Sequence, residues 1–202
     1  ASKDLCLGSW IAVFLYFDSK GTLMATTRQP MTSVRKCEYL PVVDVNSKGA
    51  FLDWGLAKDL LVPYREQHVK MVVGQSYVVY TYHESASDRI VASSKLHRHL
   101  KETNDCYRQG EEVKLQVAVI TDLGYKVVAD ECYLGLVFFA DAFRTLQVGE
   151  RLSGYVKNVR EDGKLDFLIS SGSSKHCEDL GERIILHLMA CGGRSNLSDK
   201  SP

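Results

Sequence analysis

The stretch Gly49–Pro63 decides the fold and reads Gly-Ala-Phe-Leu-Asp-Trp-Gly-Leu-Ala-Lys-Asp-Leu-Leu-Val-Pro. Two short apolar runs, Ala50–Leu52 and Leu60–Val62, flank a polar-tipped connection from Asp53 to Asp59. Short runs bounded by glycine, aspartate and proline are typical of adjacent β-strands. The stretch therefore predicts a pair of neighbouring strands, and its recurrence further along the chain extends that prediction to whole domains.

A hairpin pattern occurs three times in the sequence. Each copy begins at a glycine, namely Gly8, Gly74 and Gly149, and joins two aromatic or β-branched runs through a polar turn. The copies lie about 70 residues apart, which is longer than the roughly 20–50-residue period of a solenoid repeat. Each hairpin is thus expected to belong to its own small domain.

Three further strands are predicted before the second hairpin and three before the third. They are expected at 38–45, 50–52 and 60–62 in the second repeat and at 113–121, 125–129 and 134–138 in the third. Five short strands in about 70 residues, without a long helix, favour a small Greek-key barrel of the OB type. The connections 64–73 and 139–148 have room for a short helical turn.

The composition is that of an ordinary globular protein. Of the 202 residues 45% are hydrophobic, and no apolar run is long enough to span a membrane. Nothing in the pattern indicates secretion, so a cytoplasmic location is expected. The six cysteines are scattered without a CxxC pair, which argues against a zinc ribbon and against a disulfide framework. We expect them to be reduced thiols.

The charge balance limits any interaction with nucleic acid. Lysine plus arginine equals aspartate plus glutamate, at 25 each. Non-specific affinity for nucleic acid comes mainly from neutralising phosphates, and a neutral chain does this poorly. A nucleic-acid role must therefore depend on a local basic patch and on base stacking.

Two segments resemble the second and third strands of the ribosomal-protein S1 type of RNA-binding domain. They are Gly49-Ala-Phe-Leu and Gly135-Leu-Val, which lie in repeats of equal spacing that are each followed by the same hairpin. A closer resemblance, covering nearly the whole chain, is to the bacterial conserved virulence factor B family. It is carried by Val43-Asp-Val-Asn, Lys58-Asp-Leu-Leu-Val-Pro, Arg89-Ile-Val-Ala-Ser-Ser-Lys and Thr121-Asp-Leu-Gly-Tyr-Lys-Val, among other segments. The resemblance implies tandem S1-type domains, a C-terminal winged helix and a non-catalytic, RNA-binding regulator of gene expression.

The expected fold class is mainly β, with tandem five-stranded OB-fold barrels of the S1 type and a short C-terminal helical segment that resembles the start of a winged helix. The expected domains are 1–31 (the C-terminal hairpin of an incomplete first S1-type domain), 32–104 (the second), 105–172 (the third) and 173–202 (linker and winged-helix-like start). The last segment is a candidate contact for DNA or protein.

RNA recognition by such barrels combines aromatic stacking with nearby cations. In the second repeat Lys48 and Pro63 stand where the resemblance implies an aromatic residue and a histidine. Phe51 keeps a stacking position, although it is equally compatible with a packed barrel residue, and Lys58 is a candidate phosphate contact. Trp54 either stacks on a base or docks against a neighbouring domain.

In the third repeat Leu123 replaces the first aromatic residue and Phe138 takes the place of the histidine. An outward-facing Phe138 beside Tyr125 and Lys126 would form a stacking platform with a cation–π partner. If Phe138 points inward it is a core residue and the platform fails. The third repeat is the favoured RNA surface.

Further cations flank the hairpin turns. They are Lys157, Arg160 and Lys164 in the third repeat and Arg89 in the second. Each is a candidate RNA contact, and the alternative is a solvated turn of mixed charge, since Glu161 and Asp162 lie among them.

Catalysis has no motif in support. The six histidines have no cysteine or carboxylate at metal-ligand spacing, and His97 and His99 are expected in an exposed polar linker over 95–108. No catalytic residue, metal or cofactor is predicted. The leading hypothesis is a protein that binds single-stranded RNA and has no membrane partner. The alternative is a protein-interaction or transcription-regulator scaffold whose barrels no longer bind RNA.

Overall fold

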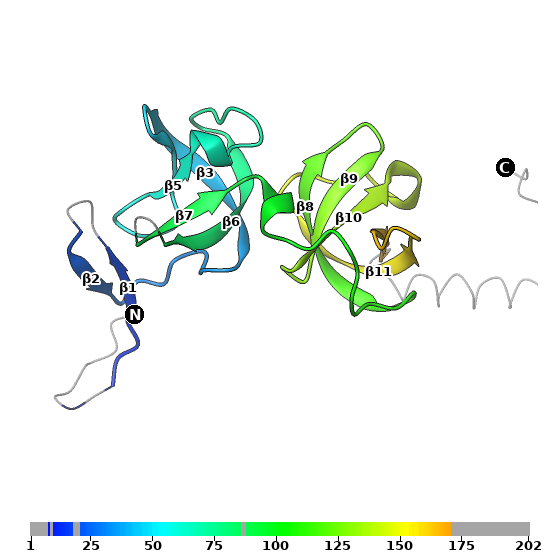
Figure 1. Cartoon of the computed structure of the whole chain (residues 1–202), viewed down its shortest axis with the longest axis horizontal. Helices are drawn as coiled ribbons and strands as arrows, with labels where there is room; N and C mark the ends of the chain where they lie inside the picture. Colours follow the sequence, from blue (N-terminus) through cyan, green and yellow to red (C-terminus); the bar gives the residue numbers. More distant parts are fainter. Residues whose placement is uncertain (1–7, 9, 18–20, 86–87, 171–202) are drawn as a thin grey trace, which may run out of the picture.

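The computed structural model describes residues 8, 10–17, 21–85 and 88–170 of the chain. Within these ranges it is almost entirely β, arranged as a hairpin followed by two compact β units (Figure 1). The predicted helix in 173–202 lies outside the described residues. In the described part of the chain, no helix is long and apolar enough to cross a membrane.

The hairpin consists of β1 (Phe14–Phe17) and β2 (Leu23–Thr26), paired antiparallel. The second barrel consists of β3 (Cys37–Asn46), β4 (Gly49–Leu52), β5 (Leu60–Pro63), β6 (Ser76–Glu84) and β7 (Arg89–Ser93). Its strands follow the order β5-β4-β3-β6-β7, and β5 and β7 lie side by side where the sheet curls round. A short 3-10 helix, η1 (Tyr64–Glu66), follows β5.

The third barrel is closed by hydrogen bonds. It consists of β8 (Glu112–Ile120), β9 (Gly124–Ala129), β10 (Tyr133–Phe138), β11 (Arg151–Val159) and β12 (Leu165–Ile169). A short parallel pairing of β10 with β12 completes the ring β10-β12-β11-β8-β9. The 3-10 helix η3 (Phe139–Asp141) follows β10, so both predicted helical turns are present. The predicted OB-type architecture and its strands are confirmed.

A glycine occupies the first position of the second strand in both barrels for a steric reason. A Cβ at Gly49 would lie 2.2 Å from the carbonyl oxygen of Val62, and one at Gly124 would lie 2.1 Å from that of Val137. Because the backbones of the second and third strands approach this closely, only glycine fits. The repeat that identifies the fold in the sequence is therefore a consequence of strand packing.

The two barrels meet through a shared apolar cluster. Its buried members are Cys37, Val78, Leu96, Leu100, Ala118, Val128 and Leu134. At the edge of this cluster the Arg151 guanidinium donates to the Cys37 carbonyl at 3.2 Å and to Glu38 Oε2 at 2.9 Å. Burial raises the pKa of the Cys37 thiol to about 12, so this cysteine is an inert packing residue.

The segment between the barrels is not the exposed linker predicted for 95–108. It carries a 3-10 helix, η2 (Leu96–Arg98), and Leu96 and Leu100 are buried in the shared cluster. The His99 ring stacks on Tyr80 with 5.0 Å between ring centroids. The prediction of an exposed His99 was wrong because its imidazole fills the space beside the tyrosines of β6, whereas His97 is exposed.

Burial sets the protonation of His99. It lowers the pKa of the imidazole, and the nearby carboxylate of Glu66 only partly opposes this effect. The His99 Nε2 atom lies 3.8 Å from Glu66 Oε2, and neither of these buried atoms has a hydrogen-bond partner among the described residues. The Glu66 Oε1 atom accepts from Arg98 at 3.1 Å. This cluster links η1 of the second barrel to the connection that leads into the third.

Candidate nucleic-acid interface

A groove of about 530 Å³ runs along the outer face of the second barrel. Phe51 on β4 and Leu61 on β5 are cross-strand partners, and both are half-buried in its floor. Since Ala50, Leu52, Leu60 and Val62 alternate with them and point into the core, Phe51 faces the groove. Phe51 is thus placed where a base can reach one side of its ring.

Two exposed cations border this groove. Lys48 precedes β4 and Arg89 begins β7, and both side chains line the hollow. Within the described part of the chain neither forms an ion pair, whereas other basic residues of this barrel do. Arg65, for example, pairs with Glu84. Lys48 and Arg89 therefore keep their positive charge available for phosphate.

One carboxylate opposes them. Asp59 also lines the groove. Partial burial raises the pKa of Asp59, and the nearby Asp53 and Asp44 raise it further. The groove consequently holds two available cations and one anion that is costly to keep charged.

Trp54 and Lys58 serve the hairpin instead of a ligand. Trp54 is buried, and its indole Nε1 donates to the Lys58 carbonyl at 2.5 Å. The ring of Phe14 meets Trp54 edge-on, with 5.7 Å between centroids. The Lys58 ammonium donates to the Phe17 carbonyl at 2.6 Å. Of the two roles considered for Trp54, docking of a neighbouring unit is the one that its contacts support, and Lys58 is committed to the same junction.

The third barrel presents the equivalent face with a different electrostatic character. Lys126 pairs across the strands with Leu136, as Phe51 does with Leu61, and both residues line a hollow of about 280 Å³. The Lys126 ammonium lies 3.5 Å from Glu102. The position that carries the aromatic ring in the second barrel therefore carries a paired lysine here.

Phe138 is half-buried and has a different cation from the one predicted. The guanidinium carbon of Arg160, not Lys126, lies 5.6 Å from the centre of its ring. Arg160 is itself held by the carboxylate of Asp166, through three hydrogen bonds of 2.6–3.0 Å. Arg160 is thus occupied by Asp166 and Phe138, and its positive charge is largely neutralised before a phosphate could approach.

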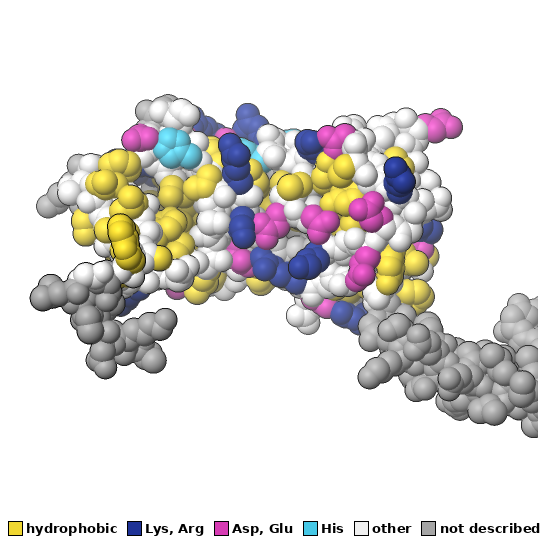
Figure 2. Space-filling view, turned by 90° about the horizontal axis from the view of Figure 1, so that it is seen from below, with side chains coloured by type: hydrophobic (Ala, Val, Ile, Leu, Met, Phe, Trp, Pro, Cys, Tyr) yellow, Lys and Arg dark blue, Asp and Glu magenta, His cyan; other side chains and the backbone are white. Residues whose placement is uncertain are grey.

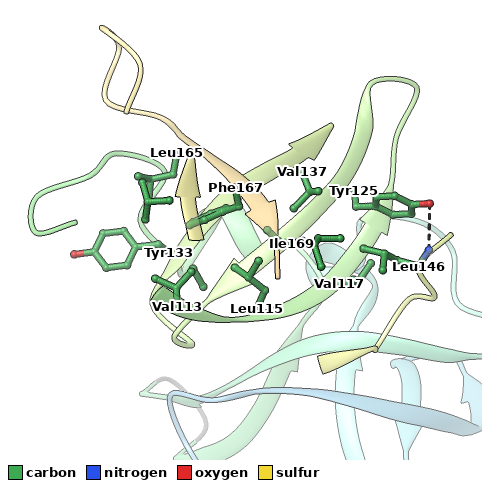
Figure 3. Close-up of a cluster of buried hydrophobic side chains, with 13 residues drawn as sticks. Val113, Leu115, Val117, Tyr125, Tyr133, Val137, Leu146, Leu165, Phe167 and Ile169 are labelled. Carbon is green, nitrogen blue, oxygen red and sulfur yellow. Dashed lines mark hydrogen bonds between the residues drawn. The ribbon is translucent and has the colours of Figure 1, made fainter. Parts of the chain in front are cut away.

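Tyr125 does not belong to a surface platform. It is buried in the core of the third barrel, where its hydroxyl accepts from the Leu146 backbone amide at 3.2 Å (Figure 3). The prediction of an exposed Tyr125 is corrected on this geometry, because residue 125 has the inward register of its strand and Lys126 the outward one.

The remaining predicted cations of the third repeat are also paired. Lys157 donates to both oxygens of Asp141 at 2.7 Å, and Lys164 lies 3.2 Å from Asp162. The mixed-charge alternative considered for this turn thus describes the structure well. Of the nine predicted RNA contacts, Phe51, Lys58 and Arg89 line one groove, where Lys58 is committed to the hairpin. Lys48, which was not predicted, joins them there.

Two residues of this groove were missed in the sequence. Tyr16 and Met24 of the hairpin line it together with Phe51 and Arg89. They are partners across the β1–β2 ladder. No local signal identifies them, because they approach the groove only when the hairpin docks on the second barrel.

The chemical character of the surface changes along the molecule. In Figure 2 hydrophobic side chains gather over the hairpin and the adjoining second barrel, whereas acidic and basic side chains are interspersed from the junction across the third barrel. An apolar surface with few cations suits stacking better than a surface of mutually neutralised charges does.

The comparison with protein families agrees with the fold. Residues 36–95 match the family model described as S1 domain. Over these residues the chain is similar to the S1 domain family. The matched region, called the S1 domain below, contains β3 to β7 together with Phe51, Lys48 and Arg89 of the groove.

Similar proteins extend beyond the S1 domain. The chain is 22% identical, over 98% of its length and 69% of theirs, to proteins named conserved virulence factor B from two strains of Staphylococcus epidermidis. It is 21% identical over the same shares to the protein of that name from Staphylococcus saprophyticus. The resemblance stated from the sequence is therefore confirmed by curated homologues.

A solved structure is similar at low identity. It is the crystal structure of a multidomain protein with nucleic acid binding domains from Streptococcus pneumoniae TIGR4, at 22% identity and a TM-score of 0.43. The match covers 99% of this chain and 74% of that one.

Proposed function

We propose that this chain is a bacterial, cytoplasmic RNA-binding protein that regulates gene expression, and that it holds single-stranded RNA in the groove of its S1 domain. The observation that carries the proposal is that one accessible aromatic ring, Phe51, shares the groove with Lys48 and Arg89, which form no ion pair among the residues that the structure describes. The homology to conserved virulence factor B and the S1 family match support the same class of function. Binding, and not catalysis, is the role proposed.

Two interactions contribute to binding in the groove, namely base stacking and phosphate contacts. A base stacked on an aromatic side chain contributes roughly 1–3 kcal/mol and does so for every base type. Phosphates on either side of that base are the natural partners of Lys48 and Arg89. The net charge of the whole chain matters little at this scale, because charges farther away than about 8 Å are screened at physiological salt.

The alternative is a scaffold for protein or transcription-factor contacts whose barrels no longer bind RNA. Paired cations on the third barrel favour it for that barrel. A contact of the segment 173–202 with DNA or protein also remains a prediction, on residues outside the described part of the chain.

The test is a titration of dye-labelled single-stranded RNA across a salt series, followed by fluorescence anisotropy. An oligonucleotide of about 12 nucleotides suits the roughly 4–16 that an OB barrel covers. The double variant Lys48→Ala/Arg89→Ala is expected to reduce the slope of log K against log salt by about 1.4, that is about 0.7 for each lost contact with single-stranded phosphate. The matched control is Lys126→Ala/Lys157→Ala, which removes two ion-paired lysines.

The outcomes separate the hypotheses. If both double variants reduce the salt slope equally, binding depends on charge in general and the groove is not the binding site. An absence of binding by the unmodified protein at low salt would reject RNA as the ligand and leave the scaffold. Stronger binding of the corresponding DNA would reject RNA as the preferred nucleic acid.

A further inference from the structure

The hairpin β1–β2 is fixed to the S1 domain by apolar packing and a partly buried hydrogen bond. Phe14 and Tyr16 both pack against the core cluster of that domain. The Lys58 ammonium closes the junction by donating to the Phe17 carbonyl at 2.6 Å. Figure 1 shows the hairpin lying against the S1 domain, on the side away from the third barrel.

One aromatic residue of β1, Tyr16, lines the groove. Phe14 and Tyr16 have the same orientation, whereas Leu15 between them is 53% exposed. Phe14 contacts Trp54 and lines neither of the two hollows at this junction. Tyr16 lines both, and its cross-strand partner Met24 lines the larger one. The hairpin is thus a wall of the groove as well as a neighbour of the domain.

The groove continues past Tyr16. A second hollow of about 160 Å³ shares Tyr16 and Arg89 with the first and extends to Leu15 and His83. A ligand longer than one nucleotide that rests on Phe51 would therefore pass over Tyr16. Within the described residues the Tyr16 hydroxyl has no hydrogen-bond partner, which leaves it free to meet a base edge or a 2′-hydroxyl.

The S1 domain alone offers few stacking surfaces, because Lys48 and Pro63 occupy two positions where the family resemblance implies an aromatic residue and a histidine. We infer that the hairpin replaces them: Tyr16 supplies a second stacking ring, so that single-stranded RNA binds across the junction between the hairpin and the S1 domain. This inference rests on the proposed function of the groove. It makes the binding site a composite of two structural units.

The rival explanation is that Tyr16 only holds the hairpin in place. A substitution that keeps apolar packing but removes the aromatic face distinguishes the two roles. Tyr16→Leu does this, and Phe14→Leu is the matched control because it changes the same strand face without touching the groove. Tyr16→Phe keeps the ring and removes only the hydroxyl.

The experiment measures single-stranded RNA affinity by anisotropy and the thermal unfolding midpoint for each variant of the full chain. Tyr16→Leu is expected to weaken binding about tenfold. Phe14→Leu is expected to change affinity less than twofold despite lowering the midpoint, and Tyr16→Phe is expected to retain most of the affinity.

Three results would overturn the inference. Unchanged affinity in Tyr16→Leu, with normal binding by the unmodified protein, would remove Tyr16 from the site and leave the proposed function intact. Equal loss in Tyr16→Leu and Phe14→Leu would reduce the hairpin to a structural role. Failure of the unmodified protein to bind any single-stranded RNA would end both proposals together.

Discussion

Substitution of Gly149 by alanine should loosen the junction between the barrels, and Gly74 provides a matched control. Each glycine precedes the last hairpin of its barrel, and their φ angles are nearly equal, at +88° and +84°. A Cβ at residue 149 would lie 2.3 Å from the Tyr39 ring, whereas one at residue 74 meets nothing within 4 Å. Both substitutions introduce the same backbone strain, but only Gly149→Ala displaces a contact between the barrels.

The magnitude follows from these two contributions. Left-handed backbone costs an alanine about 1–2 kcal/mol, which is expected for both variants. If Tyr39 turns away and exposes a further ~80 Å² of apolar surface between the barrels, the additional loss at ~25 cal/mol per Å² is about 2 kcal/mol. Gly149→Ala should therefore destabilise the protein by about 3–4 kcal/mol and Gly74→Ala by about 1–2 kcal/mol.

The assay is urea unfolding followed by circular dichroism. With an unfolding slope of about 2 kcal/mol per molar urea, the extra loss in Gly149→Ala moves the midpoint by a further ~1 M relative to Gly74→Ala. In a Tyr39→Ala background the two glycine variants should become equivalent, because the clash is gone. Equal losses in the native background would refute the reasoning and mean that Tyr39 does not bear on the junction.

Three further predictions concern single side chains. Because folding lowers the pKa of His99, the contribution of this residue to stability is present at neutral pH and is lost as pH falls from about 6.5 through the folded pKa. Chemical unfolding between pH 5 and 7.5 should therefore show that the free energy of unfolding of His99→Phe depends less steeply on pH than that of the unmodified protein. Because folding raises the pKa of Asp59, the contribution of this residue to stability is lost as pH rises through the folded pKa. Asp59→Asn should therefore raise the thermal unfolding midpoint at pH 7 and tighten RNA binding. A lower midpoint or a weaker affinity would contradict the role given to Asp59. Arg160→Gln should cost about 1.5–3 kcal/mol of stability by leaving the buried Asp166 carboxylate without its partner, while RNA affinity in anisotropy stays within twofold of the unmodified protein.

The fold was predictable from the sequence because its signals are local. Strand runs follow from alternation and turn residues, and the repeated Gly49 and Gly124 mark the same close backbone approach in both barrels. The predicted strands consequently differ from the observed ones by a residue or two at their ends. The resemblance to S1-type domains extended these local signals to the connectivity of a barrel.

The site was harder to predict because its decisive contacts are distant in sequence. The sequence favoured the third repeat because Phe138 beside Tyr125 and Lys126 would form a stacking platform, and it added Lys157 and Lys164 as candidate contacts. Lys126 is paired with Glu102 and Lys157 with Asp141, which precede them by many residues and approach only in the folded barrel. Tyr16 reaches the groove in the same non-local way. Residue type shows which side chains can bind RNA, but ion pairing decides which of them are available.

The balance of charges in the groove also limits how RNA can be held there. Lys58 is committed to the Phe17 carbonyl, so Lys48 and Arg89 are the cations that face a ligand, and Asp59 opposes them. Two phosphate contacts give a salt slope of only about 1.4, far below that of a strongly basic protein. Most of the binding energy must then come from stacking on Phe51 and Tyr16. A neutral chain is therefore compatible with RNA binding, provided that the affinity is modest, tolerant of salt and sensitive to the loss of either ring.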